Sequence, residues 1–433
     1  MMRFVAFLSV RVLRGKGGTA RYLRGAVVGI AVSLVPLIVV MEVSTGMIEG
    51  ITARLLEVGT YHLQLALPPD TTVERLDQLA EAIGAVSGVV AAVPERQGTA
   101  LLVSSQGAAG VSVRFVPSDV FARDGGFRSF ITMRDGNDDL TQTDSILASS
   151  ATAASLGIKA GDRVTLLTTY GEDMSGLPRL TSLTVRGIYE TGYQELDATL
   201  VYAPLALADR VLSSRTVRTM IGIKVADPFG DLSTVSQAVA DATGGSVRVA
   251  TWREIEFARL GSFATTKALL LLIMALVVVV ASVNVSSSVL MILFERRFDL
   301  GILKSVGASP RSLALSFLYA GFATGLLGTV LGIAAGLLVA VNINEVMAGL
   351  EWIVNQGIAL ASLVRTSFNP TAEPLGSFTL FNSAYYLKQI PIRINPGEVI
   401  AAAVATLALS AVASYIPAAR AARTRPLEVL RKV

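Results

Sequence analysis

Few side chains in this sequence are of the types that catalyse reactions or bind metals. The 433 residues include no Cys and one His, His62. These counts exclude disulfide frameworks, thiolate metal sites, Cys nucleophiles and clusters of His ligands. The sequence also has no Gly-x-x-x-x-Gly-Lys-Ser/Thr phosphate loop, no zinc motif and no catalytic-triad pattern. It therefore predicts a protein that is not an enzyme, has no ATPase motifs, and holds no metal or cofactor of its own.

Three single polar residues are the remaining candidates for chemistry. Glu42, near the end of an apolar run, and Asn284, inside another, are candidates for facing a cavity. Glu42 equally suits the membrane interface, and Asn284 equally suits a bond to a neighbouring helix. His62 begins a predicted strand, which favours a structural role. A proton- or sodium-driven carrier needs a chain of buried ionisable groups, which these runs lack, so a partner must supply the energy for any transport.

Four long apolar runs form the framework that must position the functional residues of the chain. The composition is 52% hydrophobic and 16% charged, with a mean hydropathy of +0.58, which does not fit a soluble surface. Each run is close to the ~20 residues that a helix needs to cross the hydrocarbon core. We predict a membrane α-helical protein with four transmembrane helices, at residues 25–47, 262–293, 312–341 and 397–417. A signal peptide is the alternative for the first run, but no small-x-small cleavage pattern ends it.

The basic residues are distributed unevenly along the chain. Residues 1–24, 295–311 and 420–433 together carry a net charge of +12, whereas the rest of the chain carries −8. Because Lys and Arg gather on the cytoplasmic side of membrane proteins, we predict that the amphipathic N-terminal segment 1–24, the segment 294–311 and the tail 418–433 are cytoplasmic. Lipid headgroups explain these clusters without nucleic acid. Residues 48–260 and the loop 342–394 then lie on the opposite side.

The long segment at residues 48–260 is expected to be a folded α+β domain between the first and second transmembrane helices. Short β-branched runs punctuated by Gly, Pro and Asp alternate here with helical stretches. Strands are predicted at 61–67, 111–116, 163–168, 183–188 and 221–225, and helices at 72–83, 150–156 and 205–212. Residues 166–185 have the outline of a hairpin with its tip at 169–181. The tip is either a solvated loop or a docking element.

The cytoplasmic segment 294–311 reads as a short amphipathic helix that Gly307 and Pro310 stop. Phe294, Phe298 and Leu300 place apolar groups among charges, as in a helix that lies along a membrane surface. A simple connector is the alternative, but the seventeen residues 294–310 are more than two neighbouring spans need.

Glycines form one stripe along the third predicted transmembrane helix. They recur at spacings of 4, 3, 4 and 4, so they share one helical face: Gly321, Gly325, Gly328, Gly332 and Gly336. In lipid, such a face lets another helix approach closely. The partner is either another helix of this chain or a second subunit.

Two motifs together resemble one superfamily of ABC transporter permeases. Glu-Arg-Arg-x-x-Leu-Gly-Ile-Leu-Lys-x-x-Gly-Ala covers residues 295–308, and Tyr-Ile-Pro-Ala-Ala-Arg-Ala-Ala-Arg covers 415–423. With the predicted architecture, they resemble the FtsX and macrolide-exporter superfamily. Residues 156–164, 187–197, 200–202 and 385–392 are similar to its lipoprotein-releasing branch, the LolC and LolE permeases. Residues 366–382 depart from that branch as an insertion.

The resemblance implies a multi-pass protein of the bacterial inner membrane that works by mechanotransmission, as a type VII ABC transporter. Two permeases, a second copy or a paralogue, each dock one ABC ATPase, which binds ATP and Mg. The matching coupling helix is formed by Glu295, Arg296, Arg297, Asp299, Leu300, Leu303 and Lys304. The implied function is extraction of lipoproteins from the inner membrane and their transfer to a periplasmic carrier for outer-membrane delivery.

Two further sites follow from the resemblance. A cavity for the acyl chains of the lipoprotein is expected at the outer half of the first span, at Val40, Met41, Val43, Met47 and Ile48. A hairpin that docks the carrier is expected at Tyr170, Met174, Leu177 and Pro178. The alternatives for the function are FtsX-like signalling, in which ATP binding activates a periplasmic enzyme, and tripartite efflux of a small amphiphile.

Overall fold

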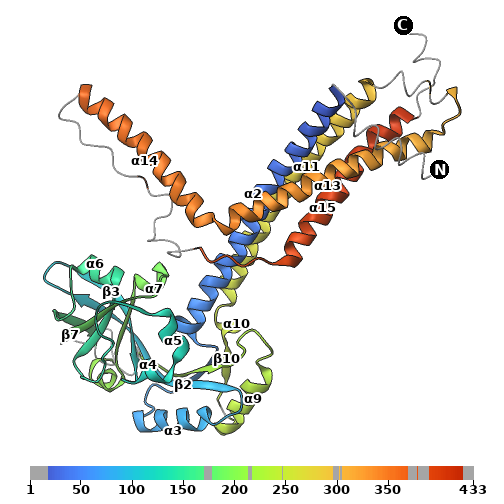
Figure 1. Ribbon diagram of the computed structural model, residues 1–433. Helices are drawn as coiled ribbons and strands as arrows, with labels where there is room; N and C mark the ends of the chain where they lie inside the picture. Colours follow the sequence, from blue (N-terminus) through green and yellow to red (C-terminus); the bar gives the residue numbers. More distant parts are fainter. Residues whose placement is uncertain are drawn as a thin grey trace. The chain divides into compact units, whose positions relative to one another are not determined.

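The computed structural model describes residues 18–169, 178–212, 217–245, 247–295, 302, 305–368, 378 and 390–422 (Figure 1). The chain forms two compact units. One, the helical bundle, comprises Met1–Met47, Phe263–Phe378 and Ile390–Val433; the other, the sheet domain, comprises Ile48–Ser262 and Thr379–Gln389. The predicted fold class, a membrane α-helical protein with a large α+β domain inserted between its first and second long helices, is confirmed.

Four helices of the described chain are long and apolar enough to cross a membrane: α2 (Gly18–Arg54), α11 (Phe257–Glu295), α13 (Pro310–Val341) and α15 (Pro396–Ala422). They extend beyond the predicted transmembrane boundaries, and α11, with 39 residues, is about 58 Å long. Ser309 caps α13 by accepting a hydrogen bond from the Ser312 amide, and Pro310 occupies the first helical position, where no donor is needed. A layer of apolar side chains from α2, α11 and α15 packs in the bundle core, including Leu34, Ile38, Val278 and Ala402.

Helix α14 (Ile343–Phe368) lies where the sequence analysis expected a loop at 342–394. Its apolar residues recur every three or four positions, which favours a helix. It begins one residue after α13, because Asn342 leaves the helical conformation at φ −102° and ψ 27°.

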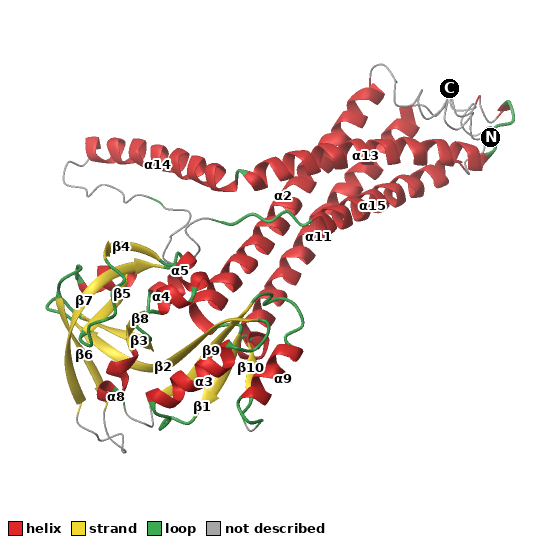
Figure 2. Cartoon of the chain, turned by 60° about the horizontal axis from the view of Figure 1, so that its bottom comes forward, coloured by secondary structure: helices red, strands yellow, loops and turns green. Residues whose placement is uncertain are grey.

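The strands of the sheet domain are one connected sheet of ten in the described chain (Figure 2). They are β1 (Leu63–Leu67), β2 (Val89–Val103), β3 (Ala108–Val116), β4 (Thr132–Gly136), β5 (Ser145–Ser149), β6 (Arg163–Thr169), β7 (Pro178–Glu190), β8 (Leu200–Pro204), β9 (Arg218–Val225) and β10 (Val249–Thr251). The order is β10-β1-β9-β2-β3-β8-β5-β7-β4, and β6 pairs with both β2 and β7. Most pairs are antiparallel, whereas β3 with β8 and β5 with β7 run parallel.

This pairing closes part of the sheet into a ring. The ring runs β2-β3-β8-β5-β7-β6 and returns to β2. Strand β2 is long enough to serve both parts, since its first half pairs with β9 in the open part and its second half with β3 and β6. Alternate residues of the ring strands form one buried core, including Val113, Phe115, Val164 and Leu166.

Helices cover the remaining faces. Helices α3 (Val73–Gly84) and α9 (Ser233–Ala242) bury their apolar sides against the open part of the sheet. Helices α4 (Val120–Arg123) and α5 (Gly125–Phe130) pack on the outer face of the ring. The short helices of the connections are α6 (Ser150–Leu156), α7 (Gln194–Asp197), η2 (Leu205–Leu207), α8 (Ala208–Val211) and α10 (Trp252–Ile255).

The predicted strands and helices of this domain are present, with two differences. The β6–β7 hairpin pairs from Arg163 with Thr184 to Thr169 with Pro178, as the outline at 166–185 predicted. Strand β1 begins at Leu63 instead of residue 61, because Tyr61 has φ +64° and cannot continue a strand. The helix predicted at 205–212 divides into the 3₁₀ turn η2 and α8.

Candidate functional site

The end of α2 enters the sheet domain through an unusual turn. After Arg54 the helix widens into one π-helical turn, η1 (Leu55–Thr60), and the chain then turns sharply at Tyr61. Tyr61 is the one residue other than glycine with a positive φ in the described chain. Such a conformation costs about 1–3 kcal/mol and persists only where the surroundings hold it. The contacts of η1 and Tyr61 supply that support.

The first group of contacts is formed by Arg114 of β3. Its guanidinium bonds both carboxylate oxygens of Glu95 and donates to the carbonyl of Val58 in η1. The Tyr61 hydroxyl donates to Glu95 at 2.7 Å. Burial and the Glu95 carboxylate raise the pKa of Tyr61 well above its ordinary value, so the phenol stays a donor. Burial alone would lower the pKa of Arg114, but the carboxylate of Glu95 raises it, and the side chain stays charged.

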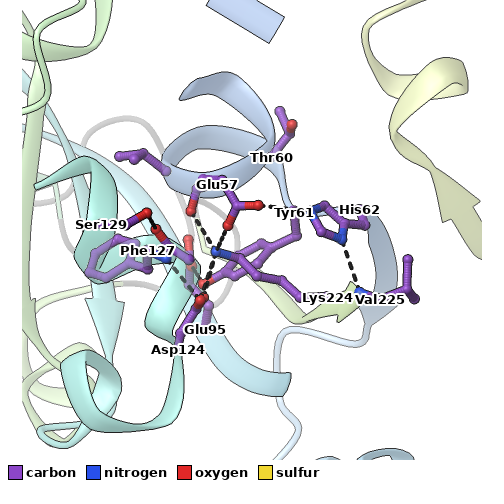
Figure 3. A network of polar contacts seen from close by, with 12 residues as sticks. Glu57, Thr60, Tyr61, His62, Glu95, Asp124, Phe127, Ser129, Lys224 and Val225 are labelled. Atoms are coloured by element: carbon purple, nitrogen blue, oxygen red, sulfur yellow. Dashed lines mark hydrogen bonds and ion pairs between the residues drawn. The ribbon is translucent and has the colours of Figure 1, made fainter. Parts of the chain in front are cut away.

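The second group is centred on Lys224 of β9 (Figure 3). Its ammonium donates to the Glu57 carbonyl at 2.9 Å, to the Glu57 carboxylate at 2.5 Å and to Asp124 at 2.8 Å. Asp124 in turn caps α5 by accepting from the Phe127 amide at 2.9 Å. Lys224 therefore connects the end of η1 with β9 and α5.

His62 completes this group by bonding through both ring nitrogens. Its Nδ1 accepts from the Val225 amide at 2.9 Å, which leaves the proton of the neutral ring on Nε2. Nε2 lies 3.3 Å from the Glu57 carboxylate, to which it donates. The side chain is 3% exposed, and its role in the sheet domain is structural.

We name these residues the junction network: Glu57, Tyr61, His62, Glu95, Arg114, Asp124 and Lys224. Two cations, Arg114 and Lys224, each bind a carbonyl of η1, where the last helical carbonyls lack partners and the helix dipole attracts positive charge. The network thus fixes the end of η1 to the strands β2, β3 and β9. Its chemistry is that of a rigid joint and not that of catalysis, because its charged groups are already paired and all of them except the half-buried Glu57 are buried.

A second polar cluster lies within the helical bundle. Lys267 of α11 donates to Glu398 of α15 at 2.7 Å and to the Thr45 hydroxyl of α2 at 2.8 Å. The Thr45 hydroxyl also lies 3.2 Å from Glu398. The amide of Asn395, just before α15, donates to Glu42 of α2 at 3.0 Å. These five residues, the bundle cluster, join three membrane helices.

Tight backbone packing accompanies the bundle cluster. A Cβ on Gly46 of α2 would lie 1.9 Å from the Pro391 carbonyl, so only glycine lets the segment before α15 pass so closely. Glu42 is completely buried beneath this segment and does not face an open cavity. Asn284 lies in α11, and its side chain lies outside the described residues.

The glycine stripe of α13 contacts two helices of the same chain. A Cβ on Gly321 or Gly325 would meet Ser414 or Ser410 of α15 within 2.8 Å. Further along, Gly328, Gly332 and Gly336 face Ile30, Leu34 and Ile38 of α2, with a Cβ at 2.8–2.9 Å. The stripe is therefore filled by internal packing at all five positions.

The residues expected to line the acyl-chain cavity differ in burial. Met41 is 7% exposed and belongs to the bundle core beside Leu37 and Val278. The other four, Val40, Val43, Met47 and Ile48, are half-buried on α2. Their role in binding acyl chains stays a prediction.

Most residues of the two predicted docking sites lie outside the described residues. Of the coupling helix, Glu295 ends α11, whereas Arg296, Arg297, Asp299, Leu300, Leu303 and Lys304 are not described. A helical bond from the Val306 amide to Ile302 and a left-handed Gly307 at φ +99° mark its predicted end. Of the carrier hairpin, Pro178 begins β7 and is exposed, whereas Tyr170, Met174 and Leu177 are not described.

Sequence reasoning singled out Glu42 and His62 but missed the other charged residues of both clusters. Arg114 lies in the alternating run Val-Ser-Val-Arg-Phe-Val, and this period places it on the face opposite Val113 and Phe115. The alternation predicts that Arg114 faces away from the core of the ring. It does not predict that the end of a helix covers and buries this side chain. Lys267 and Glu398 each stand at the margin of an apolar run, which also fits an interfacial residue without a partner.

The sequence is similar to known permeases. Residues 271–426 match the FtsX family model, described as FtsX-like permease C-terminal. The chain is 27% identical to the lipoprotein-releasing system transmembrane protein LolC of Neisseria meningitidis over 445 residues, covering 100% of both chains. It is 25% identical to LolE of Haemophilus influenzae over 439 residues, covering 98% of each.

Solved structures match a smaller part of the chain. The periplasmic region of MacB from Actinobacillus actinomycetemcomitans is 12% identical, with a TM-score of 0.31, and the match covers 47% of this chain and 94% of that one. Likeness at this level carries no argument about function. The family model and the full-length relatives agree with each other: residues 271–426 match the C-terminal part of FtsX-like permeases, and the chain is similar to LolC and LolE over its whole length.

Proposed function

We propose that this chain is the permease subunit of an ABC complex that extracts lipoproteins from the bacterial inner membrane and transfers them to a periplasmic carrier for outer-membrane delivery. The similarity to LolC and LolE carries the proposal, because it extends over the sheet domain as well as the membrane helices. The family match at residues 271–426 alone would support a permease without a cargo.

The proposed complex contains two permease chains, a pair of copies or of paralogues, and two ABC ATPases. The ATPases bind ATP and Mg, and this chain contributes no cofactor. Both chain ends and the coupling helix lie in the cytoplasm, as the distribution of basic residues favours. The sheet domain then lies in the periplasm, and its β6–β7 hairpin, including Pro178, docks the carrier.

In this mechanism the permease works as a mechanical linkage. Movement of the ATPases pushes on the coupling helix, with Leu300 and Leu303 in contact with the ATPase. Helix α2 is one continuous helix of 37 residues, and the junction network bonds its final turn to three strands. A displacement of α2 is therefore passed to the strands instead of being absorbed at a flexible link.

The acyl chains of the cargo would bind along α2. Val40, Val43, Met47 and Ile48 are apolar and half-buried, so they retain surface for a further apolar group. Methionine suits such a site because its unbranched side chain adapts to chains of different shape. Burial of each methylene of an acyl chain contributes about 0.8 kcal/mol to binding. These four residues on one helix can cover only part of the chain. A second permease chain would provide the rest of the cavity.

Depletion of the chain, followed by separation of inner and outer membranes, tests the cargo. Lipoproteins should accumulate in the inner membrane, and the wild-type gene should restore their distribution. A Leu300→Asp/Leu303→Asp variant should fail to restore it and should lose the copurifying ATPase, since charges would be buried at the contact. The matched control Leu300→Ile/Leu303→Ile should behave as wild type.

Two outcomes would contradict the proposal. If lipoproteins keep their normal distribution while a periplasmic hydrolase loses activity, the chain acts in transmembrane signalling. If they keep it while an outer-membrane tunnel protein copurifies, the chain belongs to an efflux pump.

A further inference from the structure

Helix α14 has one apolar and one polar side. Along it, Val346, Leu350, Ile353, Gly357 and Leu360 recur at spacings of 4, 3, 4 and 3, which places them on a single face. Four polar residues lie on the opposite side, Asn344, Glu351, Asn355 and Ser362, and two more, Glu345 and Gln356, lie at its margin. Two glutamates and the amides within this length argue against a helix that crosses the hydrocarbon core.

The polar side already has partners within the chain. Asn344 exchanges two hydrogen bonds with the backbone of Ile390, at 3.1 and 3.3 Å. Asn355 does the same with the backbone of Phe378, at 2.8 and 3.0 Å. The two asparagines are eleven residues apart, about three turns, and so lie on the same side. The described parts of the returning chain are thus held on the polar side of α14.

The apolar side has no such cover in the described structure. Val346 is 37% exposed, Leu350 45%, Ile353 61% and Leu360 64%. Water is a poor environment for four large side chains on one helix face, so a partner must remove them from it. The position of α14 in the chain identifies that partner.

The exposed apolar surface begins on the membrane helix α13 and continues onto α14. Leu338 and Val341, at the end of α13, are 66% and 51% exposed, as expected for side chains that face lipid. Asn342 then breaks the helix, and the exposed apolar side of α14 starts four residues later with Val346. Helix α14 therefore starts at the level where α13 leaves the bilayer.

We propose that α14 lies on the lipid surface, with its apolar side buried at the boundary between headgroups and acyl chains. Residues 343–362 contain no Lys or Arg, so burial of apolar area and not attraction to anionic lipids provides the attachment. The contact anchors the connection between α13 and α15 on the bilayer. This inference is independent of the cargo and holds for any permease function.

Spin labels on single introduced cysteines test the proposal, and the chain contains no Cys of its own. Leu350→Cys and Ile353→Cys place labels on the apolar side. The matched controls Ala348→Cys and Ala359→Cys place labels on the opposite side, where both residues are exposed. The full chain with its ATPase is reconstituted in vesicles of phosphatidylcholine and phosphatidylglycerol. Collisions of each label with oxygen, which partitions into lipid, and with a water-soluble nickel complex are then compared.

The ratio of oxygen to nickel collisions should be at least about threefold higher at the apolar-side labels than at the controls, and it should not change in 1 M salt. Equal ratios at both sides would overturn the proposal. So would low access to both reagents with spin–spin broadening at Ile353→Cys, since a second copy of the chain would then cover this side. The wild-type complex, treated with the same spin label, measures any label bound by the ATPase, and its signal is subtracted.

Discussion

The junction network joins a helix end to strands and the bundle cluster joins helices, both through charged side chains, but the two clusters differ in how deeply these side chains are buried. In the junction network the Arg114 and Glu95 side chains are 2% and 0% exposed. In the bundle cluster the Lys267 and Glu398 side chains are each 24% exposed. A buried ion that loses its partner cannot be rehydrated, whereas a partly exposed one can. The comparison indicates that the junction is a fixed joint and that the more exposed bundle cluster is the weaker contact.

The largest effect is expected from removing one partner of the junction network. Arg114→Met would leave Glu95 buried without its cation and remove a donor from the Val58 carbonyl. The free energy of unfolding of the sheet domain should fall by about 3–5 kcal/mol. Denaturant unfolding of the purified chain, followed by near-ultraviolet circular dichroism of the buried tyrosines, measures the loss.

The double variant Arg114→Met/Glu95→Leu serves as the control for this prediction. Because it removes both charges, it should lose less stability than Arg114→Met alone. A single variant that loses less than about 1 kcal/mol would show that the junction tolerates an unpaired charge, and the contrast with the bundle cluster would disappear.

The next largest effect is expected from the close backbone packing of the bundle, which stabilises it together with the charged side chains of the bundle cluster. Gly332→Ala would place a Cβ 2.9 Å from the Cβ of Leu34 and 3.1 Å from the backbone of Ala31. Such overpacking should cost about 1–3 kcal/mol. Gly29→Ala is the matched control, since nothing lies within 4 Å of its added Cβ. Thermal unfolding in detergent should show a lower midpoint for Gly332→Ala alone. Equal midpoints for the two variants would mean that α2 and α13 can move apart to admit the added methyl group without a loss of stability.

A smaller effect is expected from the bundle cluster itself. Lys267→Met removes the donor that joins Glu398 and Thr45. Since both side chains of this pair are partly exposed, the loss of stability should be about 1 kcal/mol or less. The charge exchange Lys267→Glu/Glu398→Lys should recover the wild-type midpoint. A loss as large as that of Arg114→Met would contradict the contrast between the two clusters.

Most helices and strands of this fold can be predicted from local patterns in the sequence. The apolar runs predict four membrane helices because spanning the hydrocarbon core requires length and little charge, which any single window reveals. The β6–β7 hairpin and the cap of α13 by Ser309 are likewise local. The ring closure between β2 and β6 joins residues more than sixty positions apart, and no local pattern records it.

The candidate site was harder to predict for a related reason. Lys224 reads as an ordinary strand residue until η1 and α5 surround it with Glu57 and Asp124. A buried ion pair is a property of distant segments that meet, whereas the glycine stripe of α13 is a property of one helix and was visible in its spacing. Helix α14 was missed although its period was visible, because its polar residues resemble those of a loop.

The smallest effect is expected from a change at Asp197, a buried carboxylate whose hydrogen bonds come from neutral groups. This residue allows the effect of burial to be separated from the effect of ion pairing. Asp197 accepts from the Thr191 amide at 2.9 Å and from its hydroxyl at 2.8 Å. Burial raises the pKa of Asp197 above its ordinary 3.8, although the bonds from Thr191 oppose the change. The folded state therefore favours the protonated acid, and this contribution to stability, fully present below pH 3.8, is lost as the pH rises through the folded pKa.

The variant Asp197→Asn keeps an acceptor for Thr191 and removes the charge. It should be at least as stable as wild type at pH 7, and its advantage should shrink as the pH falls toward 4, because the wild-type acid then becomes neutral as well. Unfolding midpoints of both proteins between pH 4 and pH 7 measure this difference. A variant that is less stable at pH 7 and recovers in acid would show that the charge of Asp197 stabilises the fold, and a buried carboxylate without a directly bonded cation would then behave like the paired carboxylate of Glu95.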